Sequence, residues 1–343
     1  MLSDVPTNGK GLNLSYRADF KKKTGQAYML CGWHTLSDIP LTSVPTSLHE
    51  NEKIDIHIQF ATGISPIAGF AGKVLLEHSA ECSRIGVRGI ADFEVSEGRQ
   101  IRIWPAARAM RKDIEVILLG PVWATLCHQR GLLPLHASAI VTEGGITAFA
   151  GHSGAGKSTT AALLSSLDYE LITDDILAVS VNHNSAPGAW PYLRRLKLRG
   201  DSINQLGIKA TEQVSETLDN EKYFVRPKYA AADKWTRLER LYLLEISPAD
   251  SRAAIDKLTG AEAVHALVNH TYHFQFIFNS GRFREHLALC TQLASKIAVY
   301  RLRRSRSLDA REELGSFICA HLKMPQHDTT QGKIFDRARA RFR

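Results

Sequence analysis

The sequence predicts a mixed α/β protein (α+β overall), in which a β-rich N-terminal domain precedes a domain with a central mixed sheet flanked by helices. Three observations lead to this prediction. Short strand-like segments alternate with turn residues over the first third of the chain. An apolar strand, a glycine-rich loop and a helical segment follow one another at residues 146–164. A second apolar strand, at 171–173, follows at the spacing of a strand–helix–strand crossover.

The length and composition are those of an ordinary soluble protein with two domains. The chain has 343 residues, of which 44% are hydrophobic and 23% charged. It has no apolar run near the ~20 residues that a membrane helix needs, and the N-terminus lacks the apolar core of a signal peptide. We therefore expect no membrane partner and a cytoplasmic location. The five cysteines are scattered, without a Cys-x-x-Cys pair or zinc-type spacing, so we expect reduced thiols.

Much of the net charge of +8 comes from the C-terminal stretch, around residues 301–306 and 323–343. Residues 311–343 are set apart as a basic C-terminal segment. No motif that combines stacking aromatic and basic residues accompanies these charges, so nucleic-acid binding is disfavoured. An anionic peptide or a phosphate group accounts for the charge equally well.

The first domain, residues 1–120, begins with a loose start at 1–15. Residues 54–60 alternate strictly between apolar and polar side chains, and residues 100–105 form another strand-like segment. This half carries no catalytic motif. Substrate capture and a purely structural role both remain open for it.

The second domain, residues 121–310, is expected to begin with a helix over 121–131, since a proline suits the first turn and a glycine the end. An apolar run at 132–141 and a strand at 146–150 follow, joined by a Glu-Gly-Gly turn. This order predicts an antiparallel hairpin that leads into the glycine-rich loop.

Two later elements complete the predicted second domain. Residues 241–246 are apolar enough for a central strand. A helix is expected over about 285–301, because four apolar side chains recur there at helical spacing. These side chains are Leu289, Leu293, Ile297 and Tyr300.

The glycine-rich loop is the most informative motif. Residues 151–159 read Gly-His-Ser-Gly-Ala-Gly-Lys-Ser-Thr, which fits the pattern of a glycine, four residues and Gly-Lys-Ser/Thr. Glycines let the backbone bend so that successive N–H groups point at one anion. Lys157 can reach the outer phosphates of a nucleotide, and the Ser158 hydroxyl can join the shell of a Mg²⁺ ion. The alternative is a glycine-rich turn with no ligand. The residues expected to bind the nucleotide are Gly151, Ser153, Gly154, Ala155, Gly156, Lys157, Ser158 and Thr159.

Two adjacent aspartates, Asp174 and Asp175, follow the strand at 171–173. A right-handed crossover would bring the carboxyl end of that strand beside the loop. One carboxylate would then bind Mg²⁺ and the other would accept the proton of an attacking hydroxyl. Our interpretation takes Asp174 as the base and Asp175, with Ser158, as the metal ligand, although the two roles can be exchanged. The alternative is a solvated turn that caps a helix.

Three further side chains are candidates for the site. His136 lies on the strand expected to run antiparallel to the loop strand, where an imidazole can bond a carboxylate and tune the base; a structural histidine is the alternative. Arg226 and Lys228 flank a proline and are candidates to steady the charge of a transferring phosphoryl group. The alternative for both is an ordinary surface position.

Together these motifs resemble the catalytic domain of the HPr kinase/phosphorylase family. In that family a histidine-bearing strand, a Gly-x-Ser-Gly-x-Gly-Lys-Ser loop and a closely following Asp-Asp occur in the order found here at His136, residues 151–158 and residues 174–175. The Leu-Lys-Leu-Arg-Gly stretch at 196–200 and the Val-Arg-Pro stretch at 225–227 are also similar to family motifs.

Three departures from the family pattern bear on the reverse, phosphorylase activity and on HPr as the substrate. Lys197 stands where the family carries a metal-associated glutamate, and whether Asp201 substitutes for it is open. The Arg-Pro loop lacks the Gly-Arg-Asn continuation, and the run after the Asp-Asp pair also differs. The stretch at 129–139, together with the β-rich N-terminal half, resembles more closely the HPr-kinase-like proteins of lasso-peptide gene clusters.

The resemblance implies a P-loop kinase that uses ATP and Mg²⁺ to phosphorylate a serine hydroxyl, most specifically the C-terminal serine of a lasso-peptide precursor. One alternative is a kinase of HPr or another small carrier protein. Another is a non-catalytic, nucleotide-responsive binding module. The resemblance also allows a homo-oligomer.

Overall fold

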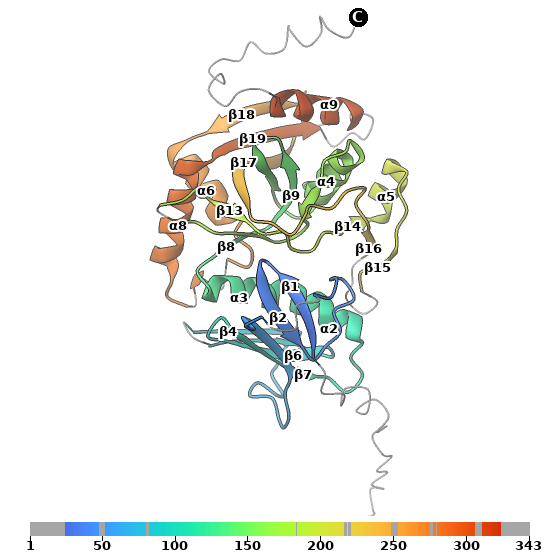
Figure 1. Cartoon of the computed structure of the whole chain (residues 1–343), viewed down its shortest axis with the longest axis vertical. Helices are drawn as coiled ribbons and strands as arrows, with labels where there is room; N and C mark the ends of the chain where they lie inside the picture. Colours follow the sequence, from blue (N-terminus) through green and yellow to red (C-terminus); the bar gives the residue numbers. More distant parts are fainter. Residues whose placement is uncertain are drawn as a thin grey trace, which may run out of the picture.

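Two seven-stranded sheets organise the chain in the computed structural model (Figure 1), which confirms the predicted mixed α/β class with a β-rich N-terminal part. The structure describes residues 25–47, 52–79, 82–182, 184–215, 218, 221–247, 253–274, 277–278, 280–305 and 311–323. The predicted loose start at 1–15 and most of the basic segment, from 324 onward, lie outside the described residues.

The N-terminal sheet has the strand order β1-β2-β3-β7-β6-β5-β4. Alternation places Ile56 and Ile58 of β3 in its core, where both are fully buried. The strands predicted at 54–60 and 100–105 are confirmed as β3 and β7. The strand bounds are β1 (Gln26–Leu30), β2 (Trp33–Ser37), β3 (Ile56–Phe60), β4 (Val74–His78), β5 (Cys82–Val87), β6 (Ala91–Ser96) and β7 (Gln100–Pro105).

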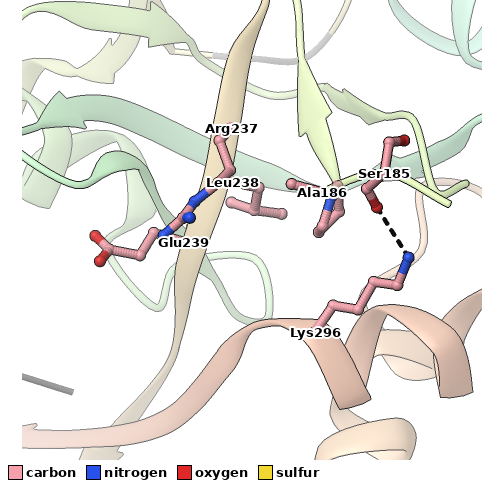
Figure 2. A pocket seen from close by; sticks show the side chains of 7 residues that line it. Ser185, Ala186, Arg237, Leu238, Glu239 and Lys296 are labelled. Carbon is pink, nitrogen blue, oxygen red and sulfur yellow. Dashed lines mark hydrogen bonds between the residues drawn. The ribbon is translucent and has the colours of Figure 1, made fainter. Parts of the chain in front are cut away.

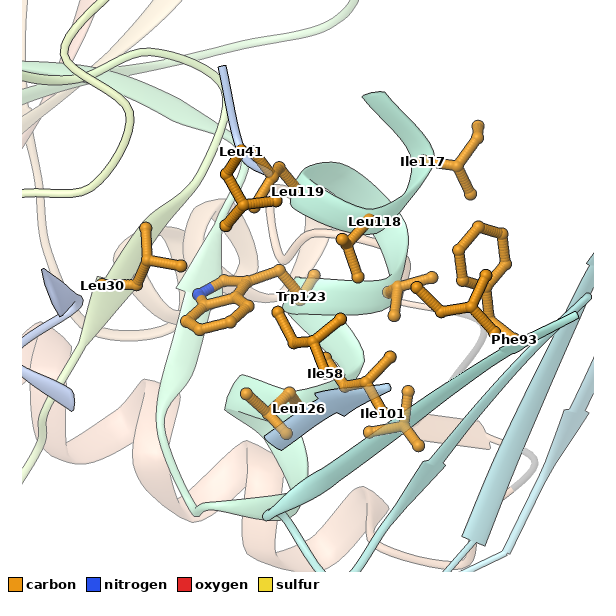
Figure 3. Packing of buried hydrophobic residues seen from close by; sticks show 14 of the residues in the cluster. Leu30, Leu41, Ile58, Phe93, Ile101, Ile117, Leu118, Leu119, Trp123 and Leu126 are labelled. Carbon is orange, nitrogen blue, oxygen red and sulfur yellow. The ribbon is translucent and has the colours of Figure 1, made fainter. Parts of the chain in front are cut away.

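A kinked helical segment packs on this sheet. It comprises α2 (Arg111–Ile117), η1 (Leu118–Val122) and α3 (Trp123–Gln129). The helix predicted to start at Pro121 therefore starts earlier; the proline lacks an N–H group, and the chain kinks beside it at Gly120 (φ −109°, ψ −108°). Trp123 is fully buried among side chains of the sheet and of α3 (Figure 3). The predicted domain boundary at residue 120 therefore lies within this helical segment. The segment packs against the N-terminal strands on both sides of that residue.

The second sheet has the order β11-β9-β10-β17-β19-β18, with β13 paired to β17 and a separate β8–β12 pair beside it. The predicted hairpin is confirmed, because β9 and β10 pair antiparallel. Since β11 is also antiparallel to β9, it runs in the same direction as β10, with β9 between them. The bounds are β8 (Leu133–Leu135), β9 (Ala137–Thr142), β10 (Gly145–Ala150), β11 (Leu171–Thr173), β12 (Leu177–Val179), β13 (Gly188–Ala189), β17 (Thr236–Ser247), β18 (Ala254–Leu258) and β19 (Ala298–Ser305).

Helices cover both faces of the second sheet. Successive side chains along each strand point alternately to one face and the other. Ala148 of β10 packs toward α6 (Gly260–Asn269) and α8 (Phe283–Lys296), whereas its neighbour Phe149 packs toward α4 (Lys157–Ser166) and α9 (Arg311–Leu322). A small third sheet beside α4 contains β14 (Leu196–Arg199), β15 (Glu212–Gln213) and β16 (Lys222–Val225), with α5 (Gly200–Leu206) after β14.

The helix predicted over 285–301 ends five residues early. Helix α8 stops at Lys296, Ile297 is extended, and Tyr300 lies on β19. Strand β19 pairs with β17 on one side and β18 on the other, so sheet pairing satisfies its backbone and overrides the helical spacing of its apolar residues.

Two sequence-level expectations concern membranes and thiols. None of the helices in the described part of the chain combines the length and apolarity needed to cross a bilayer. All five cysteines are free thiols.

Candidate active site

The glycine-rich loop connects β10 to α4 at the carboxyl edge of the second sheet. Gly154 and Gly156 have φ angles of +83° and +94°, in the left-handed region that favours glycine. A Cβ atom at Gly154 would meet nothing within 4 Å, so backbone conformation rather than crowding selects glycine there. Gly156 is the N-cap of α4, and the loop amides therefore lie beside a helix N-terminus. This combination is a general anion-binding arrangement.

Lys157 begins α4 and lies across its own loop. Its Nζ donates hydrogen bonds to the carbonyl oxygens of Gly151 (2.8 Å) and His152 (3.3 Å), and the residue is buried. Burial lowers the pKa of Lys157, while the carboxylates of Asp175 and Asp174 act in the opposite direction. The ammonium group thus bonds the loop, and the two carboxylates act on it through their charge.

Asp174 is almost fully buried and accepts three hydrogen bonds. The hydroxyl groups of Ser138 (2.5 Å) and Ser158 (2.9 Å) donate to its Oδ1, and the backbone N–H of Lys197 donates to its Oδ2 (2.7 Å). Alternation along β9 directs Ser138 toward the α4 face of the sheet. Asp174 therefore connects the sheet, the loop helix and β14 at one point.

Asp175 lies next to Asp174 but in a different environment. The Lys197 Nζ donates to its Oδ2 (2.8 Å), and the His136 Nε2 lies 3.3 Å from its Oδ1. Burial alone would raise the pKa of Asp175, but Lys197 and His136 more than offset it and hold this pKa well below its usual range. Its φ of +86° is in the left-handed region, a strain that proteins often retain at functional sites.

His136 lies between β8 and β9 and is partly exposed. Its backbone N–H donates to the carbonyl oxygen of His270 (2.7 Å), and its ring packs edge-on against Tyr272 at 5.3 Å between centroids. His270 in turn packs against His152 of the loop. Burial, with His152 nearby, lowers the pKa of His270 to about 4, so this ring is neutral at physiological pH.

The remaining loop residues surround the same point. Ser153 is exposed at the tip of the loop, and the Thr159 hydroxyl lies 3.2 Å from that of Ser202 at the start of α5. The carbonyl oxygen of Ala155 accepts a hydrogen bond from the Arg304 Nη2 (2.9 Å). The structure thus brings the predicted loop residues, both aspartates and His136 together.

Arg226 and Lys228 are not brought to this point. The backbone N–H of Lys228 donates to the Ser165 hydroxyl (3.3 Å), and its Nζ pairs with Asp168 (2.5 Å), both at the C-terminal end of α4. Arg226 is exposed beside it. At a rise of ~1.5 Å per residue, α4 separates this end from Lys157 by about 13 Å.

Three side chains belong to the site that the sequence analysis did not propose as site residues. Ser138 and Lys197 hold the aspartates, and Arg304 reaches the loop from the end of β19. Lys197 lies in an alternating stretch, so its polar side chain was identifiable as facing away from the apolar core. Ser138 is two residues from His136, a spacing that places both on one face of an extended strand. No local signal linked Arg304 to the loop, because parallel pairing of β10, β17 and β19 brings it there.

The residues present fit a magnesium nucleotide. Mg²⁺ is commonly held by one or two carboxylates with hydroxyl, phosphate and water oxygens, and the Ser158–Asp174 contact supplies one hydroxyl and one carboxylate side by side. Among the described residues, no group of three or more His, Cys, Asp or Glu side chains could hold a metal by itself. Such an ion would therefore need phosphate or water oxygens to complete its shell.

A cavity of about 320 Å³ lies at the start of β17 (Figure 2). It is lined by Arg237, Leu238 and Glu239 from the start of that strand, and the Lys296 Nζ donates to the Ser185 carbonyl oxygen (2.9 Å) at its border. Since β10 and β17 are parallel, this is the edge of the sheet away from the glycine-rich loop. It contains none of the predicted site residues.

No protein-family model and no curated protein matches this sequence. Solved structures do match, among them the structure of the Hpr(Ser) kinase/phosphatase from Coxiella burnetii. That protein is 12% identical to this chain, with a TM-score of 0.30, and the match covers 55% of this chain and 95% of that one.

Proposed function

We propose that the protein is an ATP- and Mg²⁺-dependent kinase that transfers the γ-phosphoryl group to a serine hydroxyl. The observation that carries the proposal is the convergence of the glycine-rich loop with two unlike carboxylates. Asp174 bonds the Ser158 hydroxyl, and Asp175 bonds His136 and Lys197 instead. Phosphoryl transfer requires mainly positioning and charge stabilisation, and these groups supply both.

The contacts favour an exchange of the two aspartate roles. Ser158 and Asp174 would hold Mg²⁺, because their oxygens already lie together. Asp175 is the more exposed carboxylate and would face the acceptor. Its low pKa keeps it ionised and able to accept a hydrogen bond from an incoming hydroxyl.

The loop amides and Lys157 would bind the nucleotide phosphates, the latter by exchanging its bonds to the loop carbonyls for phosphate oxygens. Bound Mg²⁺ would neutralise charge on those phosphates. The acceptor oxygen bonds to the γ-phosphorus as the bond to the bridging oxygen of ADP breaks, and Asp175 takes up the hydroxyl proton. His136 and Lys197 keep the Asp175 carboxylate in one orientation through this step.

The acceptor that we propose is a serine-ended peptide such as a lasso-peptide precursor. The purified protein is incubated with ATP, Mg²⁺ and, separately, a serine-ended peptide and HPr. We expect the peptide to gain about 80 Da, the mass of one phosphoryl group. If only HPr gained mass, the acceptor would be a carrier protein rather than a peptide. If ATP bound but no phosphorylated product formed, the protein would be a nucleotide-responsive module rather than a kinase.

A further inference from the structure

A groove of about 370 Å³ lies between the C-terminal end of α4 and the small β14–β16 sheet. Leu196 and Val225 at its floor are buried, Ile208 and Pro227 are partly exposed, and its charged side chains are exposed and all positive. Leu196, Val225 and Pro227 form the apolar part, and Lys209, Arg226 and Lys228 form the cationic part. An apolar wall with cations along it is complementary to an extended acidic peptide that also carries apolar side chains.

The positive charge of this groove is only partly compensated. Lys228 pairs with Asp168, while neither Lys209 nor Arg226 forms an ion pair with any residue that the structure describes. The basic C-terminal segment of this chain has the same sign of charge, which disfavours it as the occupant. The complementary partner is therefore an acidic chain from another molecule.

The groove adjoins the candidate active site through β14. Leu196 lines the groove, and the next residue, Lys197, contacts both aspartates. Along α4, the two ends of the helix are about 13 Å apart, a span that about four residues of extended peptide cover at ~3.3 Å each. Neighbouring side chains on a strand point to opposite faces, so the groove and Asp175 lie on opposite faces of β14.

We propose that this groove docks an acidic segment of the acceptor peptide, at a distance along the peptide from the serine that receives the phosphoryl group. This proposal rests on the proposed kinase function for the identity of its occupant. Acidic side chains pair with Lys209 and Arg226, and an apolar side chain between them packs on Ile208 and Pro227, the partly exposed apolar residues of the groove.

Binding without nucleotide tests the groove separately from catalysis. The probe is a fluorescein-labelled ten-residue peptide of alternating Glu and Leu that ends in Ser, compared by anisotropy with a peptide that has Lys in place of Glu. We expect only the acidic peptide to bind the full-length protein. The double variant Lys209→Glu/Arg226→Glu should weaken its binding about tenfold or more, since it replaces two attractive charge pairs with repulsive ones. The control Lys73→Glu/Lys234→Glu changes the net charge equally at exposed positions elsewhere and should bind the acidic peptide within about twofold of the parent protein.

If the groove and control variants weakened binding equally, the proposal would be overturned, because the net charge of the protein alone would then explain the binding. Displacement of the peptide by ATP would also overturn it. So would a single-stranded RNA oligonucleotide that bound more tightly than the peptide and lost its binding in the groove variant. If no phosphoryl transfer is found but the binding pattern holds, the groove stands as a peptide site and the kinase proposal fails. If transfer to the acidic peptide proceeds with unchanged KM in the groove variant, the kinase stands and the docking proposal fails.

Discussion

The two ends of helix α4 differ in how their charges are compensated. At the N-terminal end, Lys157 bonds the loop carbonyl of Gly151, Asp174 bonds Ser158, and Asp175 is paired with Lys197. At the C-terminal end, exposed cations line a groove without enough carboxylates to balance them. The first end has the preorganised geometry that chemistry requires, and the second has the open charge that recognition of an anionic partner requires.

The largest expected effect is at the N-terminal end. Asp175→Asn should lower kcat by about 10²–10⁴, the range for loss of a general base, because the amide cannot accept the hydroxyl proton. The affinity for ATP should remain close to that of the parent protein, since Asp175 bonds His136 and Lys197 rather than the loop. Single-turnover transfer and titration with a fluorescent ATP analogue measure the two quantities.

Asp174→Asn provides the matched comparison for this variant. It should raise the Mg²⁺ concentration required for half-maximal nucleotide binding, because Asp174 is the carboxylate beside Ser158. If Asp175→Asn shifted the Mg²⁺ requirement while Asp174→Asn did not, the roles would revert to the original interpretation of the sequence.

A smaller effect is expected for Lys157→Ala. Removal of one charged donor to phosphate should weaken ATP binding about 10–100-fold, from the ~1.5–3 kcal/mol of a charge-assisted hydrogen bond. Turnover should fall as well. Isothermal titration of the variant with ATP and Mg²⁺ checks this, and an unchanged affinity would show that the lysine stays on the loop carbonyls when nucleotide binds.

Much of the N-terminal end of α4 could be predicted from the sequence, because the loop motif and the Asp-Asp pair are local patterns. Which aspartate does what could not be predicted, because Ser138 and Lys197 contact Asp174 from 36 and 23 residues away. Arg304 reaches the loop from 149 residues away.

The positions of Arg226 and Lys228 depend on a contact between distant segments, the pairing of β14 with β16. A Val-Arg-Pro stretch indicates a rigid loop, but only the pairing of β14 with β16 decides that it lies at the far end of α4. The same limit applies to Tyr300, whose helical spacing from Leu293 could not reveal the pairing of β19 on both sides.

Lys197→Met should have a still smaller effect, of about tenfold on kcat, together with a shift in the pH profile. Without the ammonium group, which lowers the pKa of Asp175 in the parent protein, this pKa should rise. A carboxylate serves as a base only above its pKa, so the acidic limb of kcat/KM should move to higher pH. The variant Lys197→Arg retains the charge and should keep the limb near its original position; an unshifted limb in both variants would exclude Lys197 as the group that holds Asp175 ionised.

Acid unfolding must be distinguished from the shift of the kcat/KM profile. The buried histidines on the other face of the second sheet predict the pH range in which unfolding occurs. Burial lowers the pKa of His286 to about 4, against ~6.5 in an unfolded chain. Between these values the unfolded chain binds the extra proton, so the free energy of unfolding falls as the pH decreases. For this residue alone the loss between pH 7 and 5 should be about 2 kcal/mol. Urea titrations at the two pH values measure it. His286→Gln should reduce the difference between them, whereas His265→Gln, at an exposed position on α6, should leave it near the parent value. An equal pH dependence in the parent and His286→Gln would mean that His286 is solvated before the chain unfolds.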